Sequence, residues 1–162
     1  MCSKNTSTDV SLIENPTCRY TLDDVISDLT IEELQSLIGY LQDVEGILQS
    51  SPFPHVEIDT SYGDIIIYDS ALGWQKNTIE ISTVAVRCVF SQSVTIKTDI
   101  LASVFEPEDI DVSVSSDGYS TVIKSELVLN NNVLALDFVK AIHALLRCFD
   151  RIHSLSEQPQ NK

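Results

Sequence analysis

The chain has 162 residues, of which 24 are acidic and 10 basic, and its formal net charge is −14. Affinity for nucleic acids and for anionic membranes rests largely on Lys and Arg side chains, so this balance disfavours both as partners. The hydrophobic fraction of 43% is sufficient for one globular domain, and no apolar run approaches the ~18 residues that a transmembrane helix requires.

The N-terminal residues 1–19 are polar and aperiodic, which predicts a flexible tail. They lack the apolar stretch of a signal peptide, so a cytoplasmic location is expected. Charge is uneven along the chain. Residues 1–74 hold thirteen acids and two bases, a net charge of −11, whereas the remainder holds eleven acids and eight bases, a net charge of −3. The strongly acidic half, residues 1–74, forms either a solvated surface or a surface that attracts a basic partner.

Two helices are predicted after this tail. A capping-box spacing that begins at Thr21 predicts a short helix over residues 22–28. A second box, beginning at Thr30, predicts a longer helix over residues 31–49, whose apolar side chains recur at steps of three and four. Pro52 follows shortly, and a proline cannot continue a helix.

The hydrophobic period then changes to two, which predicts antiparallel strands. The predicted strands cover residues 55–59, 64–68, 78–90 and 93–97. The alternation slips at Ser82 and Thr83, which indicates a bulge or a bend at that point. Residues 70–77 are predicted to form a loop that contains Trp74.

Residues 98–105 have helical spacing of their apolar side chains, and a helix is favoured over the alternative of a continued strand. Residues 110–114 alternate again and are followed by Asp117 and Gly118, a pair that favours a two-residue type I′ hairpin turn. Residues 119–129 form the returning strand.

The clearest element is an amphipathic helix over residues 135–152, and the sequence becomes polar after it. The predicted fold is α+β: N-terminal helices, an antiparallel sheet of five or six strands, a short helix, and a long C-terminal helix packed on the sheet. One domain is expected over residues 20–155, between the tail of residues 1–19 and a polar tail of residues 156–162.

The arrangements that catalysis requires are missing from the sequence. The five glycines are too dispersed for a phosphate-binding loop. His143 and Cys148 are five residues apart on one predicted helix, about 140° apart around its axis, so they cannot face one site. We therefore expect no enzyme, no cofactor and no metal ligand. Four acids could bind a hard cation, but an exposed acidic turn is the preferred interpretation. They are Glu106, Glu108, Asp109 and Asp111.

Two features are candidates for contact with a partner. Trp74 lies in a glycine-containing loop, where a tryptophan either covers the core or serves as a binding hot spot. The second feature is a group of acids in the strongly charged half, which are equally explained as carboxylates at helix N-termini. They are Asp23, Asp24, Asp28, Glu32 and Glu33.

A hairpin over residues 110–129 with its Asp117-Gly118 step, a polar break, and a helix over residues 138–152 follow one another in this chain. In this order the segment resembles the second half of the YbjN-like family and, more distantly, the type III secretion chaperones. The earlier helix and strands fit the opening of that family.

The resemblance implies an α-βββ-α-ββ-α fold, from which the chain departs by the extra helix at 22–28 and the long strand region at 78–97. Chaperones of that class are acidic, non-catalytic and usually dimeric, and hold extended segments of other proteins on sheet edges and helix grooves. The resemblance therefore implies a chaperone or adaptor for another protein, with a homodimer as its state, and the acidic charge of the chain favours a basic partner.

Two alternatives belong to other classes. The order of helices and strands also resembles the helix-grip folds (START and Bet v 1-like proteins), which carry a hydrophobic ligand between sheet and helix. That fold needs residues 98–105 to be a strand and needs a hollow interior beneath the last helix. An acidic inhibitor or immunity-type protein that covers a basic partner would have the same composition.

Overall fold

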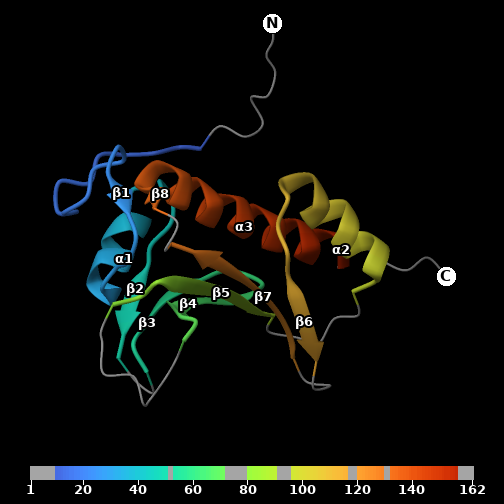
Figure 1. Cartoon of the computed structure of the whole chain (residues 1–162). Helices are drawn as coiled ribbons and strands as arrows, with labels where there is room; N and C mark the ends of the chain where they lie inside the picture. The colour runs from blue at the N-terminus through green and yellow to red at the C-terminus, as the bar shows by residue number, and fades with distance from the viewer. Residues whose placement is uncertain are drawn as a thin grey trace, which may run out of the picture.

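The computed structural model describes residues 10–50, 53–71, 80–90, 96–116, 120–129 and 132–156. In this part of the chain, helices cover one face of a six-stranded antiparallel sheet, and a two-stranded sheet lies beside the N-terminal helix (Figure 1). The predicted α+β class is confirmed, including the long C-terminal helix on the sheet.

The large sheet has its strands in the spatial order β2-β3-β4-β5-β7-β6. The strands are β2 (Ile47–Gln49), β3 (His55–Asp59), β4 (Gly63–Asp69), β5 (Thr83–Phe90), β7 (Thr121–Val128) and β6 (Ser113–Ser116). Their alternating apolar residues point to the helical layer, because successive side chains of a strand point to opposite faces. Ile65, Cys88 and Ile123 are neighbours across three central strands, and all are fully buried.

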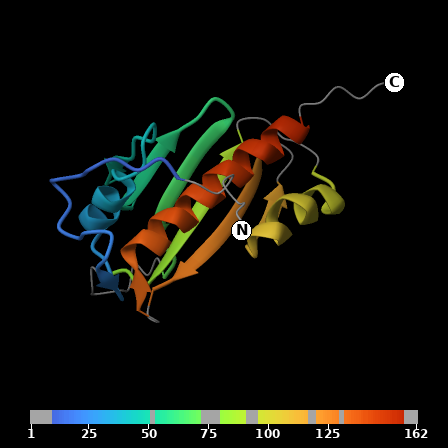
Figure 2. The ribbon, with the colours of Figure 1, turned by 90° about the horizontal axis from the view of Figure 1, so that it is seen from above.

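The helical layer consists of α1 (Ile31–Ile38), α2 (Thr98–Phe105) and α3 (Ala135–Ser156). Viewed from above, α3 lies over the sheet and runs in roughly the same direction as its strands, with α1 on one side of the molecule and α2 on the other (Figure 2). The predicted apolar stripe of α3 is confirmed, since all its members are buried in the core except Leu146, which is partly buried. They include Phe138, Ile142, Leu145, Phe149 and Ile152.

The predicted helix over residues 22–28 is wrong. The carboxylate of Asp24 accepts a hydrogen bond from the Thr21 N–H at 2.8 Å, which closes a turn. The chain then forms β1 (Val25–Ile26), which pairs with β8 (Val133–Leu134). A helix of seven residues has little stability of its own, so pairing with a distant strand prevails over the local capping signal.

The predicted helix over residues 31–49 begins correctly at its capping box but ends at Ile38. Leu41 forms a bridge with Leu12, and the carbonyl of Tyr40 accepts a hydrogen bond from the Ile13 N–H at 2.9 Å. The helix is thus followed by a turn at residues 39 and 40 and then by the bridge at Leu41, which prevents it from continuing. Residues 47–49 of the predicted helix become edge strand β2 instead.

The same contacts correct the predicted N-terminal tail. Residues 10–19 are packed on the domain, with Val10, Leu12 and Cys18 partly buried against its core. Residues 1–9 lie outside the described part of the chain. The polar character of residues 10–19 concealed three apolar side chains that are too widely spaced to show a period.

The predictions between residues 81 and 129 have mixed outcomes. Residues 98–105 form α2, as favoured, and the slip at Ser82 is a bend before β5. The hairpin of β6 and β7 is confirmed, but Ser116 pairs with Thr121, so four residues separate the strands where a type I′ turn has two. Residues 96 and 97 are not in a strand, and residues 91–95 of the predicted strand lie outside the described residues.

Cys88 and Cys148 are buried, as predicted for core thiols. Burial raises the pKa of Cys88 to about 12, with Asp64 adding to the effect, and burial raises that of Cys148 to about 11, assisted by Glu108. Both values exceed the ordinary value of 9.0, so the folded state retains these protons where the unfolded state loses them. The stabilisation is fully present below about pH 9 and is lost as the pH rises through the folded values.

We therefore expect the free energy of unfolding, measured by urea titration, to decline from about pH 9 upward. In native protein at about pH 8, iodoacetamide should leave Cys88 and Cys148 unmodified by mass spectrometry, because only the thiolate reacts. The double variant Cys88→Ala and Cys148→Ala should show a shallower alkaline decline. Rapid alkylation of either thiol before unfolding would contradict the burial described here.

Candidate functional site

The edge strand β6 is the most open part of the sheet. All four residues of Ser113–Ser116 are exposed, and Val114 retains 42% of its accessible surface. Among the described residues, the backbone of Ser113, Val114 and Ser115 pairs with β7 alone. Edge strands are usually protected by charges, proline or bulges, and the sequence Ser-Val-Ser-Ser has no charge and no proline.

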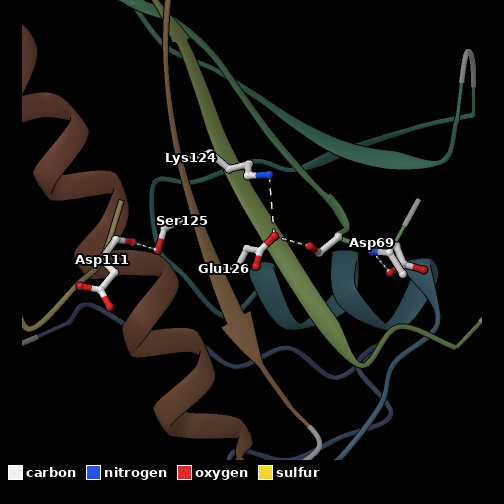
Figure 3. A network of polar contacts seen from close by, with 7 residues as sticks. Asp69, Asp111, Lys124, Ser125 and Glu126 are labelled. Atoms are coloured by element: carbon white, nitrogen blue, oxygen red, sulfur yellow. Dashed lines mark hydrogen bonds and ion pairs between the residues drawn. The ribbon is translucent and has the colours of Figure 1, made fainter. Parts of the chain in front are cut away.

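Two contacts hold this edge in place. Ser113 to Ser116 pair in register with Lys124 to Thr121 of β7. Just before the strand, the Ser125 hydroxyl donates a hydrogen bond of 2.9 Å to the Asp111 carbonyl (Figure 3). The open edge is therefore a fixed template, since its inner side is attached to a central strand along its whole length.

A turn with four exposed carboxylates leads into β6, and we call it the acidic turn. It consists of Glu106, Glu108, Asp109 and Asp111. Asp109 adopts the left-handed conformation with φ 58°, and its N–H donates to the Glu106 carbonyl at 2.9 Å. In the described part of the chain, none of the four carboxylates forms an ion pair. The turn thus presents negative charge beside the open edge, although Glu108 also lines a pocket that contains Lys140 and Arg147.

The face of the sheet away from the helices carries an unusual pair of cations. Arg87 on β5 lies directly opposite Lys124 on β7, and like charges in this position repel each other. Arg87 lies over the ring of Tyr68, 5.6 Å from its centre, and its buried Nε has no hydrogen-bond partner. Lys124 contacts Glu126 at 3.7 Å, and Glu126 also accepts from the Ser70 hydroxyl (Figure 3).

Three carboxylates gather on the same face at the turn between β3 and β4. Glu57, Asp59 and Asp64 each offer an oxygen within 4.8 Å of the others, a spacing that would suit a hard cation. Partial burial, followed by the neighbouring Asp59, raises the pKa of Asp64. The sequence analysis missed this group, although Asp59 and Asp64 flank a short turn and so were in position to pair.

The predicted partner-contact residues differ in their positions and contacts in the structure. Trp74 lies outside the described residues. Asp24 closes the turn before β1, and Glu33 completes the α1 capping box and contacts Arg19 at 2.9 Å, so both have structural roles. Asp23 and Glu32 are exposed.

The structure brings several of these acids together. After burial, the charges of Glu33, Asp28 and Asp24 raise the pKa of Tyr20. This group lies near β1 and α1, at the end of the molecule opposite β6 (Figure 1). It is therefore separate from the acidic turn, and the protein has negative charge at both ends.

Two features of the structure differ from what the helix-grip alternative requires. Residues 98–105, which that fold needs as a strand, form α2. Large side chains of α3 fill the space above the sheet, including Phe138, Ile142 and Phe149, all of which are buried. A pocket of about 270 Å³ lies on the other side of α3. It is lined by Val10, Glu108, Asp137, Lys140, Ala141, His143, Ala144 and Arg147.

His143 and Cys148 are not brought together. His143 lies in the surface pocket, where burial, followed by the charge of Arg147, lowers its pKa. The Cys148 thiol points into the core and contacts the Val104 carbonyl at 3.7 Å. As predicted from their spacing, they do not form a nucleophile and base pair.

Comparisons with known proteins give no relatives: no family model, no curated protein and no solved structure matches this chain. Among the described residues, no helix is long and apolar enough to cross a membrane. The function must therefore be argued from the surfaces described above.

Proposed function

We propose that this chain is a non-catalytic protein-binding domain, of the chaperone or adaptor kind, that holds an extended segment of another protein on β6. The observation that carries the proposal is the open edge of β6, which is exposed, uncharged and fixed to β7. A peptide that adds to such an edge gains main-chain hydrogen bonds along its length, and neighbouring side chains supply the specificity.

The order of elements supports this proposal. Along the chain, α1 is followed by β3, β4 and β5, then α2, then the β6–β7 hairpin, then α3. This is the α-βββ-α-ββ-α order of the YbjN-like family and the type III secretion chaperones, with β2 and the β1–β8 sheet as additions. Proteins of that order use sheet edges to hold partner segments, which agrees with the edge identified here.

The other edge of the sheet offers a matched comparison. Ile47 on β2 is 44% exposed and Val114 on β6 is 42% exposed, so each presents one apolar side chain at an uncharged edge. Lysine is a natural protection for edge strands, because a strand that pairs there must bury its charge. Val114→Lys and Ile47→Lys therefore introduce the same charge at the two edges, beside Ile123 on β7 in one case and opposite Glu57 on β3 in the other, and the free energy of unfolding of both variants is measured alongside binding.

We expect a display library of random octapeptides to yield sequences that bind the wild-type chain. Val114→Lys should weaken their binding by about 10-fold or more, which is ~1.4 kcal/mol, and Ile47→Lys should change it by less than about twofold. Failure to enrich any peptide, or equal losses in both variants, would overturn the proposal.

Light scattering tests whether the segment that binds β6 comes from a second copy of this chain rather than from another protein. A mass of twice 18.0 kDa that returns to 18.0 kDa in Val114→Lys would show that β6 pairs with itself. We expect no such change at this edge, because each copy carries a net charge of −14 and an acidic turn beside the strand.

A further inference from the structure

Building on the proposed function, we infer that the segment bound on β6 places an apolar residue opposite Val114 and a Lys or Arg opposite Asp111, three residues away. The strand register and the free carboxylates of the acidic turn lead to this pattern. It defines the class of partner as an extended protein segment with a basic end.

The apolar position follows from the face on which Val114 lies. Val114 pairs with Ile123, which is fully buried beneath the helices, so the two side chains share the inner face of the sheet. Val114 itself remains 42% exposed, and among the described residues β6 pairs with a strand on the β7 side alone. An added strand would place one side chain beside it, about 5 Å away, and an apolar side chain there removes both from water.

The basic position follows from the acidic turn. Asp111 lies two residues before Ser113, which corresponds to about 7 Å along an extended strand. Its carbonyl is fixed to β7 by Ser125, so its place beside the edge is defined. Asp111 forms no ion pair in the described structure, so a Lys or Arg opposite it would meet an unpaired carboxylate, with Asp109 and Glu108 two and three residues earlier in the acidic turn.

Of the two intervening positions, the one opposite Ser113 disfavours a basic residue. Ser113 pairs with Lys124 of β7 on the outer face of the sheet, and its side chain is too small to separate Lys124 from an added strand. A cation opposite Ser113 would therefore approach the ammonium group of Lys124, with Arg87 one strand further away. Repulsion at Ser113 and attraction at Asp111 together select where the charge of the partner lies.

The test uses synthetic heptapeptides with a central valine and threonine at the neighbouring positions. One has lysine three residues on each side of the valine, so that either strand direction places a lysine opposite Asp111. Its counterpart has glutamate at both positions. Binding is followed by NMR titration of the backbone N–H signals of Ser113, Val114 and Ser115 at low ionic strength.

We expect the lysine peptide to bind about 10-fold more tightly than the glutamate peptide, and the ratio to fall to about threefold or less at ~0.3 M salt. The double variant Glu108→Gln and Asp111→Asn should lose most of this preference. The matched control, Asp43→Asn and Glu45→Gln beside β2, removes the same charge and should retain the preference.

The outcomes separate the inference from the proposed function. If both peptides shift the β6 signals with equal affinity, or if the two double variants lose the preference equally, the basic-end pattern is overturned and strand addition at β6 stands. If neither peptide shifts these signals, both are overturned.

Discussion

Replacing Gly63 by alanine is expected to destabilise the protein by about 3 kcal/mol or more. Gly63 begins β4 with φ 154°, a conformation that other residues rarely adopt. A Cβ atom at this position would lie 2.1 Å from the carbonyl oxygen of Val89 and 2.9 Å from the Cα of Phe90. Both are backbone atoms of the neighbouring strand, so relief requires β4 and β5 to separate.

Chemical denaturation followed by circular dichroism would measure this loss. Gly39→Ala is the matched control, because Gly39 has an ordinary φ of −64° and its added Cβ would meet the end of the Asn15 side chain at 2.7 Å and the Ser36 carbonyl oxygen at 3.1 Å, both farther than the 2.1 Å contact at Gly63. The control should cost about 1 kcal/mol or less. Equal stability of Gly63→Ala and wild type would show that β4 and β5 do not approach as described.

Phe149→Ala is expected to cost about 3–5 kcal/mol, the range for removal of a fully buried aromatic side chain. Phe149 has no accessible surface and its ring lies 6.3 Å from that of Phe105, so it joins α3 to α2 as well as to the core. With folding free energies of about 5–15 kcal/mol, this loss would remove much of the stability.

The control for this variant is Arg151→Ala on the exposed side of the same helix, which should change stability by about 0.5 kcal/mol or less. Urea unfolding of both variants measures the difference. Similar small effects would mean that the apolar stripe of α3 does not form the core.

The parts of the fold that were predicted correctly are those with long, regular patterns. The stripe of α3 continues over many turns, β3 and most of β5 alternate well enough to define their inner faces, and β4 is marked by its run of three isoleucines. The errors lie in short segments whose local signals compete with distant partners. The capping spacing at Thr21 is real as a turn, but β8, more than a hundred residues away, determines that a strand follows it.

Only one part of the candidate site, the acidic turn, could be recognised in the sequence. The acidic turn was recognised as a cluster, because its four carboxylates are close in the chain. Its position beside an open edge was not, since either strand of the hairpin could have joined the sheet. The register of β7 with β5 decides this question, and it leaves β6 outermost. That choice depends on packing across the whole sheet rather than on local sequence.

The small β1–β8 sheet joins the N-terminal part of the chain to its C-terminal part. The N–H groups of Ala135 and Leu136, the first residues of α3, donate to the carbonyls of Asp24 and Leu22 at 2.8 and 3.0 Å. Helix N-termini normally need side-chain caps for such groups. Here the backbone of the N-terminal segment serves as that cap, so the longest helix is completed only when residues 22–26 are in place, and the first and last parts of the chain fold as one cooperative unit.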